Sequence, residues 1–289
     1  MPSRADWGLS SRIAWLVTRH GKARALRPAL GAAAGLAVRT LRAVDTDAFG
    51  AFSRETDRRG SPLDAARAKI DAGAAAHPGA TVLLASEGSF GPHPAIPFLA
   101  LGDELVLLRD LRTGLEVAGR DIGPATNYAH RVVSGPGEAL AFADACGFPA
   151  HGMIVLGVVE GRPAPDAFAC KTARTREDLA RAVAGAVEAC GSAFVETDMR
   201  AHRNPTRLSA IRRAGRDLSL RLASPCPRCA RPGFWRVRSL PGLPCSDCGA
   251  PTRRPVAEVL GCSGCGHESE RRLAGEAWAD PAVCENCNP

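Results

Sequence analysis

Lysine is almost absent from this 289-residue sequence. Only Lys22, Lys69 and Lys171 occur, and the other 34 basic residues are arginine. An ammonium group is a compact point charge that the planar guanidinium group does not imitate. We therefore expect the three lysines at positions where that difference matters. Long apolar runs are also absent: no run reaches the roughly 18 residues that a membrane span needs. We expect no membrane segment and, without a signal-peptide pattern, a cytoplasmic protein.

Hydrophobic residues make up 45% of the sequence, which is enough for a packed core in one large domain and one small domain. The net charge of +7 is unevenly distributed. Residues 200–221 hold seven arginines and a single acid, Asp217. This imbalance favours an anionic partner, although a solvated basic helix face is the commoner explanation for such a run.

The cysteines divide the chain. Eight of the eleven follow residue 225, in four pairs that each enclose two residues. Two such pairs supply the four sulfurs of a tetrahedral zinc site, so the sequence predicts two structural zinc ions. Sequential pairing of the first pair with the second and the third with the fourth is favoured, and a cross-braced arrangement stays open. The predicted ligands are Cys226, Cys229, Cys245, Cys248, Cys262, Cys265, Cys284 and Cys287.

Residues 1–222 alternate between strand and helix patterns, which predicts an α/β domain with a mixed twisted sheet, flanking helices and a ligand cleft at the strand ends. Residues 223–289 are predicted to form a double zinc-ribbon module. Ser61 and Pro62 mark the start of a helix that extends to about residue 76. Other helices are expected near 22–34, 137–146, 176–190 and 205–222. Strands are expected near 12–18, 36–44, 81–86, 95–100, 104–109, 114–119, 152–159 and 192–196.

Polar side chains follow several of these strands, where ligands collect in α/β sheets. Glu87 comes directly after the strand 81–86, and Asp64 lies on the preceding helix. Two carboxylates and nearby cations suit a Mg²⁺ ion that bridges phosphate groups. The candidate catalytic residues are Asp64, Glu87, Asp45, Asp47 and Glu196, and the candidate ligand contacts are Lys22, Lys69, Ser89, Asn127, Lys171, Arg200 and Arg203.

Four motifs occur in a fixed order: ASEGSFGPHP, ETDMRAHRNPTR, PGFW with GLPCSDCGAPT, and CENCNP at the end of the chain. Together they resemble an uncharacterised bacterial family over essentially the whole sequence. This resemblance implies a shared design for the α/β part and the cysteine module, and it implies no activity.

Residues 12–120 also resemble the inosine triphosphatase-like pyrophosphatases, which include enzymes for non-canonical purines. The similarity lies in Lys22 after the first strand, Asp64 followed by Lys69 on a helix, and Glu87 after the next strand. It implies an elongated α/β fold with a central cleft, Mg²⁺ held by Asp64 and Glu87, and phosphates contacted by Lys22 and Lys69. The sequence departs from that family where Arg19 replaces an asparagine.

The sequence therefore predicts a Mg²⁺-dependent hydrolase of a nucleotide or a related phosphoanhydride, with a structural zinc module. Two alternatives stay open: a protein that binds a phosphorylated metabolite without hydrolysing it, and a zinc-ribbon protein that binds nucleic acid. The nucleic-acid partner is less favoured, because the arginines of 204–221 spread over more than one helix face. The oligomeric state is not predicted.

Overall fold

The computed structural model of the chain describes residues 7–45 and 60–289, so the predicted site residue Asp47 lies outside the described residues. The chain divides into two compact units. One, the α/β unit, comprises Leu9–Ser219. The other, the cysteine unit, comprises Leu220–Pro289 together with Trp7 and Gly8 among the described residues. No helix in the described part of the chain combines the length and the apolar character needed to cross a bilayer.

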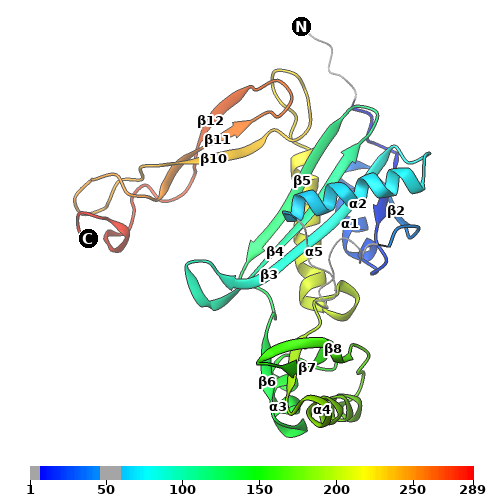
Figure 1. Cartoon of the computed structure of the whole chain (residues 1–289). Coiled ribbons are helices and arrows are strands. Elements are labelled where there is room, and N and C mark those ends of the chain that lie inside the picture. Colours follow the sequence, from blue (N-terminus) through cyan, green and yellow to red (C-terminus); the bar gives the residue numbers. More distant parts are fainter. Residues whose placement is uncertain (1–6, 46–59) are drawn as a thin grey trace. The chain divides into compact units, whose positions relative to one another are not determined.

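The first sheet of the α/β unit has the strand order β2-β1-β3-β4-β5. β1 (Ile13–Val17) pairs in parallel with β2 (Ala37–Leu41) and with β3 (Val82–His93). β4 (Ile96–Asp110) and β5 (Leu115–Gly123) extend the sheet as an antiparallel meander, visible as long arrows in Figure 1. The sheet is therefore mixed, as the sequence predicts.

Helices pack on the faces of this sheet at glycines. α2 (Pro62–Ala76) approaches β1 and β3 so closely that a Cβ at Gly73 would lie 2.5 Å from Val17. α5 (Pro205–Leu222) packs on β5, where a Cβ at Gly119 would collide with the backbone of α5. α1 (Ala23–Ala34) contacts α5 through Leu26. The sheet core is apolar because the central strands are buried on both sides.

A second, antiparallel sheet follows β5, with the order β6-β9-β7-β8. Its strands are β6 (His130–Val133), β7 (Met153–Val159), β8 (Arg162–Cys170) and β9 (Ala193–Thr197). α3 (Pro136–Ala145) and α4 (Arg176–Cys190) supply the apolar side chains that cover it. After β9 the chain forms the short helix η2 (Ala201–Arg203) and then enters α5, which returns it to the first sheet.

The cysteine unit contains one three-stranded antiparallel sheet of β10 (Trp235–Pro241), β11 (Pro255–Gly261) and β12 (Glu268–Arg272), with β11 in the centre. A short helix, η3 (Pro281–Val283), precedes the last cysteine pair. The four cysteine pairs lie in the turns that surround this sheet.

The predicted class, α/β with flanking helices and a C-terminal cysteine module, is confirmed. The strands between residues 130 and 197 form a sheet of their own, and β6 and β8 were not expected. β3 is also longer than predicted and continues to His93, because it pairs with β4 over its whole length. Glu87 consequently lies inside a strand opposite Leu105, and its expected position after the strand end was wrong.

Candidate functional site

The eight cysteines form two groups of four. Cys226 and Cys229 meet Cys262 and Cys265, and the second group holds the other four. Within each group all four sulfur atoms lie within 4.8 Å of one another. The closest contacts in the second group join Cys245 to Cys287 at 3.8 Å and Cys248 to Cys284 at 3.7 Å.

These distances fit a tetrahedral zinc ion. With Zn–S bonds of about 2.3 Å, the sulfurs at the corners of a tetrahedron are about 3.8 Å apart. In the first group the Cys226–Cys265 and Cys229–Cys262 sulfur pairs are both 3.7 Å apart. A disulfide would place the sulfurs at about 2 Å. Two four-cysteine groups could therefore hold two metal ions, and the donor set is consistent with zinc.

The cysteine pairs combine differently from the arrangement that their spacing favours. The first cysteine pair meets the third and the second meets the fourth, so the favoured sequential pairing was wrong and the cross-braced alternative holds. The antiparallel pairing of β10 with β11 explains this. It sets Trp235 opposite Gly261, which brings the turn after Cys226 beside the turn that begins at Cys262.

All four cysteine turns share one backbone hydrogen bond. The residue four positions after the first cysteine donates its N–H to the carbonyl of that cysteine: Ala230 to Cys226, Gly249 to Cys245, Gly266 to Cys262 and Asn288 to Cys284. Three of these four positions have positive φ, and Ala230 (φ 59°) is the one among them that is not glycine. The turn aims both sulfurs of a pair at one point.

Hydrogen bonds to the Cys262 sulfur favour the form that binds a metal. Burial by itself raises the pKa of this thiol, but amide N–H groups of Cys265 and Gly264 and the Cys229 thiol outweigh it and lower the pKa to about 7. Such bonds favour the thiolate, which is the form that binds metal. His267, the nearby histidine, instead stacks on Phe234, with ring centroids 5.7 Å apart.

In the α/β unit, five charged side chains gather in what we call the charge cluster: Lys22, Lys69, Glu87, Glu104 and Arg207. Each residue is at most 6% exposed. Lys69 on α2 forms an ion pair with Glu87 on β3, and Arg207 on α5 forms one with Glu104 on β4. Gly88 leaves the space for the second pair, because a Cβ there would collide with the Glu104 carboxylate.

Lys22 is the cation of the charge cluster without its own acid. Its Nζ donates to the carbonyl oxygen of Ser86 at 2.8 Å and to the Ser86 hydroxyl at 3.2 Å, and it forms no ion pair within the described part of the chain. Burial and the nearby charges of Arg207 and Lys69 together lower the pKa of Lys22 to about 7, against the opposing effect of Glu87 and Glu104. The charge cluster thus holds three basic groups and two acids.

Residues 198–207 connect the charge cluster to the second sheet. Asp198, which is 0% exposed, accepts hydrogen bonds from the backbone amide and from the guanidinium group of Arg200 and caps the turn. Asn204, also fully buried, donates to the Asn127 side chain at 2.8 Å and accepts from the Arg207 amide at 2.9 Å. The loop at residues 18–22 meets this segment where His20 stacks on His202, with ring centroids 5.1 Å apart.

The structure thus places Lys22, Lys69 and Glu87 together in the charge cluster. Arg200 and Arg203 lie within the 198–207 segment, and Asn127 contacts this segment through Asn204. The Arg200 and Arg203 side chains donate to the carbonyl oxygens of Lys171 and Ala173. Sequence reasoning missed Glu104, Asp198 and Asn204 as partners. The sequence does hold a signal for Glu104. This acid directly precedes the apolar run Leu105–Leu108, and such a position predicts a buried carboxylate.

The remaining predicted residues have separate surroundings. Asp45 contacts Arg19 at 3.2 Å with both side chains more than half exposed, Ser89 is exposed on β3, and Glu196 is buried on β9. Asp64 caps α2: it accepts hydrogen bonds from the hydroxyl and amide of Ser61, which lower its pKa.

The expected magnesium ligands do not fit that ion in this arrangement. Mg²⁺ requires several oxygen donors around one point. Asp64 is engaged as a helix cap, and Glu87 faces the ammonium group of Lys69. Among the described residues, only the two cysteine groups bring together three or more side chains of the types that bind metals. The magnesium site stays a prediction.

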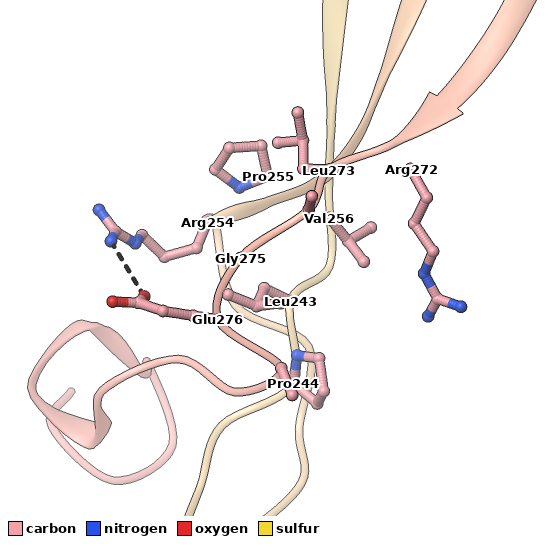
Figure 2. Close-up of a pocket in the computed structure, with 11 residues that line it drawn as sticks. Leu243, Pro244, Arg254, Pro255, Val256, Arg272, Leu273, Gly275 and Glu276 are labelled. Atoms are coloured by element: carbon pink, nitrogen blue, oxygen red, sulfur yellow. Dashed lines mark ion pairs between the residues drawn. The ribbon is translucent and has the colours of Figure 1, made fainter.

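The cysteine unit also has an open hollow of about 540 Å³ between the ends of β11 and β12 and the turn before Cys245. Its walls are mostly apolar and include Leu243, Val256 and Leu273. Figure 2 shows the side chains of Arg254 and Arg272 pointing away from each other, and Arg254 forms an ion pair with Glu276 at 3.6 Å. None of the residues predicted from the sequence lines this hollow.

These features define a mixed α/β protein with a C-terminal cysteine module that could hold two metal ions. A family model, DUF6671, described as a domain of unknown function, matches residues 73–289. The chain belongs to this family, which confirms the resemblance to an uncharacterised family. The matched region includes all eight clustered cysteines, Glu87, Glu104 and Arg207, whereas Lys22 and Lys69 precede it. A search of curated proteins gives no match.

Proposed function

We propose that the α/β unit binds the phosphoryl group of a nucleotide or another phosphorylated small molecule at the charge cluster. The observation that carries this proposal is the charge balance among the described residues: three basic side chains and two acids are buried together, and the acceptors of Lys22 there are both neutral. A buried charge without a counterion is costly. A bound anion would supply the missing negative charge.

The start of α1 supports the same location. Lys22 is the N-cap residue of α1, no side chain caps this end, and the first turn carries no acid. α2 and α4 differ, because each begins with a complete capping box in which Asp64 or Asp178 provides a negative charge. Free amides and the helix dipole favour an anion at a helix N-terminus. α1 thus begins beside the charge cluster without a side-chain cap and without an acid in its first turn.

Hydrolysis of a phosphoanhydride is the reaction that this binding site would serve. Glu87 is buried beside Lys69 within the charge cluster, so a carboxylate lies next to the cations that would hold a phosphoryl group. It could orient a water molecule for attack, while Lys22, Lys69 and Arg207 stabilise the negative charge that develops. A magnesium ion would enter with the nucleotide as part of the substrate. The resemblance to inosine triphosphatase-like enzymes agrees with this assignment and stays a prediction.

Nucleic-acid binding is less favoured, because internal partners occupy many of the arginines. In α5, Arg207 pairs with Glu104 and Arg213 with Asp121. In the cysteine unit, Arg238 and Arg271 pair with acids of the same sheet. Arginines that are neutralised in this way release few counterions from a nucleic acid.

The test uses the full-length, zinc-loaded protein. Calorimetry measures binding of inorganic pyrophosphate and a panel of nucleoside triphosphates, and a second assay measures release of phosphate or pyrophosphate with Mg²⁺ present. We expect binding that Lys22→Met abolishes and that Arg181→Met leaves intact, because Arg181 is an exposed arginine on α4 and its replacement removes the same unit charge.

The two parts of the proposal have separate outcomes. If the protein turns over a nucleotide, Glu87→Gln should lower the rate by roughly a hundredfold or more. Binding without turnover by the parent protein would remove hydrolysis and retain the phosphoryl site. Absence of binding by any of these anions would remove both.

A further inference from the structure

We propose that Lys22 is a nucleophilic amine that forms an imine with the carbonyl carbon of a phosphorylated aldehyde or ketone held at the charge cluster. The inference rests on the proposed phosphoryl site and adds the class of ligand that Lys22 would capture covalently.

The geometry distinguishes Lys22 from the other lysine of the charge cluster. Lys69 forms an ion pair with Glu87, so its ammonium form is stabilised. Among the described residues, the hydrogen-bond acceptors of Lys22 Nζ are the carbonyl and hydroxyl oxygens of Ser86. Arg207 and Lys69 face it as like charges, and Glu87 and Glu104 face it as opposite charges without contacting it. This environment favours loss of the Lys22 proton.

A neutral amine at neutral pH is the requirement for imine formation. The pKa of Lys22, about 7, leaves a large fraction of this amine unprotonated near neutral pH, whereas an ordinary lysine titrates above about 10. Desolvation next to another cation is an established way to activate a lysine. The same surroundings would hold the phosphate of the ligand and present its carbonyl group to Nζ.

The reaction is a balanced condensation. The lone pair of the Lys22 Nζ attacks the carbonyl carbon, a carbinolamine forms, and loss of one water molecule gives the C=N bond. No oxidant or reductant takes part. The reverse step is hydrolysis of the imine, so the complex is reversible until a hydride donor such as borohydride reduces it to a stable secondary amine.

The composition of the chain makes the experiment easy to interpret, because Lys22, Lys69 and Lys171 are its only lysines. The full-length, zinc-loaded protein is incubated with pyridoxal 5′-phosphate, which carries both an aldehyde and a phosphate, and is then reduced with borohydride. Peptide mass spectrometry locates the added mass. We expect most of the label on Lys22, although only 6% of this residue is exposed.

Two controls separate chemistry from folding. Lys22→Arg cannot form an imine, and it should lose the label while its zinc content matches the parent. Lys171→Arg should retain the label on Lys22. If Lys22→Arg fails to fold, the distribution of label over the three lysines of the parent still decides the question.

Pyridoxal without the phosphate separates this inference from the proposed function. Equal labelling of Lys22 by both reagents would keep the imine and remove the phosphoryl site. Binding of pyrophosphate by the parent, with label only on Lys171 or the N-terminal amine, would overturn the imine and keep the phosphoryl site. Loss of both signals would overturn both proposals.

Discussion

Arg207 and Glu104 form an ion pair in which the two side chains are 2% and 0% exposed. The pair joins the start of α5 to the middle of β4, across 103 positions of sequence. Arg207 also donates to the carbonyl oxygen of Met199, so it ties the 198–207 segment to the first sheet.

This pair predicts a large loss of stability for Arg207→Met. Removing the guanidinium leaves Glu104 buried without its partner, which costs roughly 3–5 kcal/mol in the free energy of unfolding. Arg213→Met is the matched control on α5; its pair with Asp121 is partly exposed and is worth under about 1 kcal/mol. Chemical denaturation of both variants measures the difference. The double variant Glu104→Gln with Arg207→Met should recover much of the loss, and equal losses for the two single variants would contradict the assignment.

Cross-braced pairing predicts the metal content of double cysteine variants. Cys226→Ser with Cys262→Ser disrupts one group of four, so the protein should keep one zinc ion per chain. Cys226→Ser with Cys245→Ser disrupts both groups, so both ions should be lost. Elemental analysis of the purified variants distinguishes these results. Sequential pairing would give the opposite pattern.

Ala230 predicts a stabilising substitution in the cysteine unit. It adopts φ 59° at a position where the second and third cysteine pairs have glycine. The left-handed conformation costs a non-glycine residue about 1–2 kcal/mol, and glycine loses part of this gain through its greater freedom when unfolded. Ala230→Gly should therefore strengthen zinc retention in the first group by up to about 1 kcal/mol. Competition with a chelator measures the retention of zinc, and Ala250→Gly is the control outside the turn position. Weaker zinc retention in Ala230→Gly than in the parent would contradict the prediction.

Lys22 is predicted to reduce stability in the unliganded protein. The pKa of Lys22 is about 7 in the folded protein and 10.5 in the unfolded reference state. The unfolded chain therefore binds the Lys22 proton more tightly than the folded protein does. The resulting penalty is fully present below about pH 7, shrinks as the pH rises and is absent above 10.5. A shift of this size corresponds to on the order of 5 kcal/mol.

Lys22→Met removes the buried amine and with it this penalty, although the Ser86 acceptors lose a donor. We expect a free energy of unfolding at neutral pH that equals or exceeds that of the parent, together with loss of anion binding. Denaturant titrations at several pH values check this. A marked loss of stability in Lys22→Met would indicate that Lys22 serves the fold and not a ligand.

Local signals in the sequence predicted the helices and the first sheet well. Ser61 and Pro62 define the start of α2 through side-chain capping and a fixed φ, which depend only on neighbouring residues. β8 was missed because its sequence, RPAPDAFAC, is proline-rich and largely exposed; it pairs only with β7 at the edge of the sheet. Its strand character comes from that pairing and not from a local pattern.

The charge cluster could be predicted from the sequence only in part. Lys22, Lys69 and Glu87 stood out by composition and by resemblance, and the structure does place them together. Asp64 also stood out, but a capping box offers the same residue types a local partner, and Ser61 lies only three residues away. Cysteine spacing identified the ligands without fixing their pairing, because that depends on which strands of the sheet become neighbours.

We propose that the charge cluster lacks one negative charge, which a phosphoryl group supplies. Carbon-13 labelling of the lysine side chains should give three signals in an NMR pH titration, one for each lysine. We expect the signal that is absent from Lys22→Met to titrate near pH 7 in the free protein. Its midpoint should rise by at least about one unit with saturating pyrophosphate, because a nearby anion favours the ammonium form. Three signals that all titrate above about pH 10, or a Lys22 midpoint that pyrophosphate leaves unchanged, would contradict it.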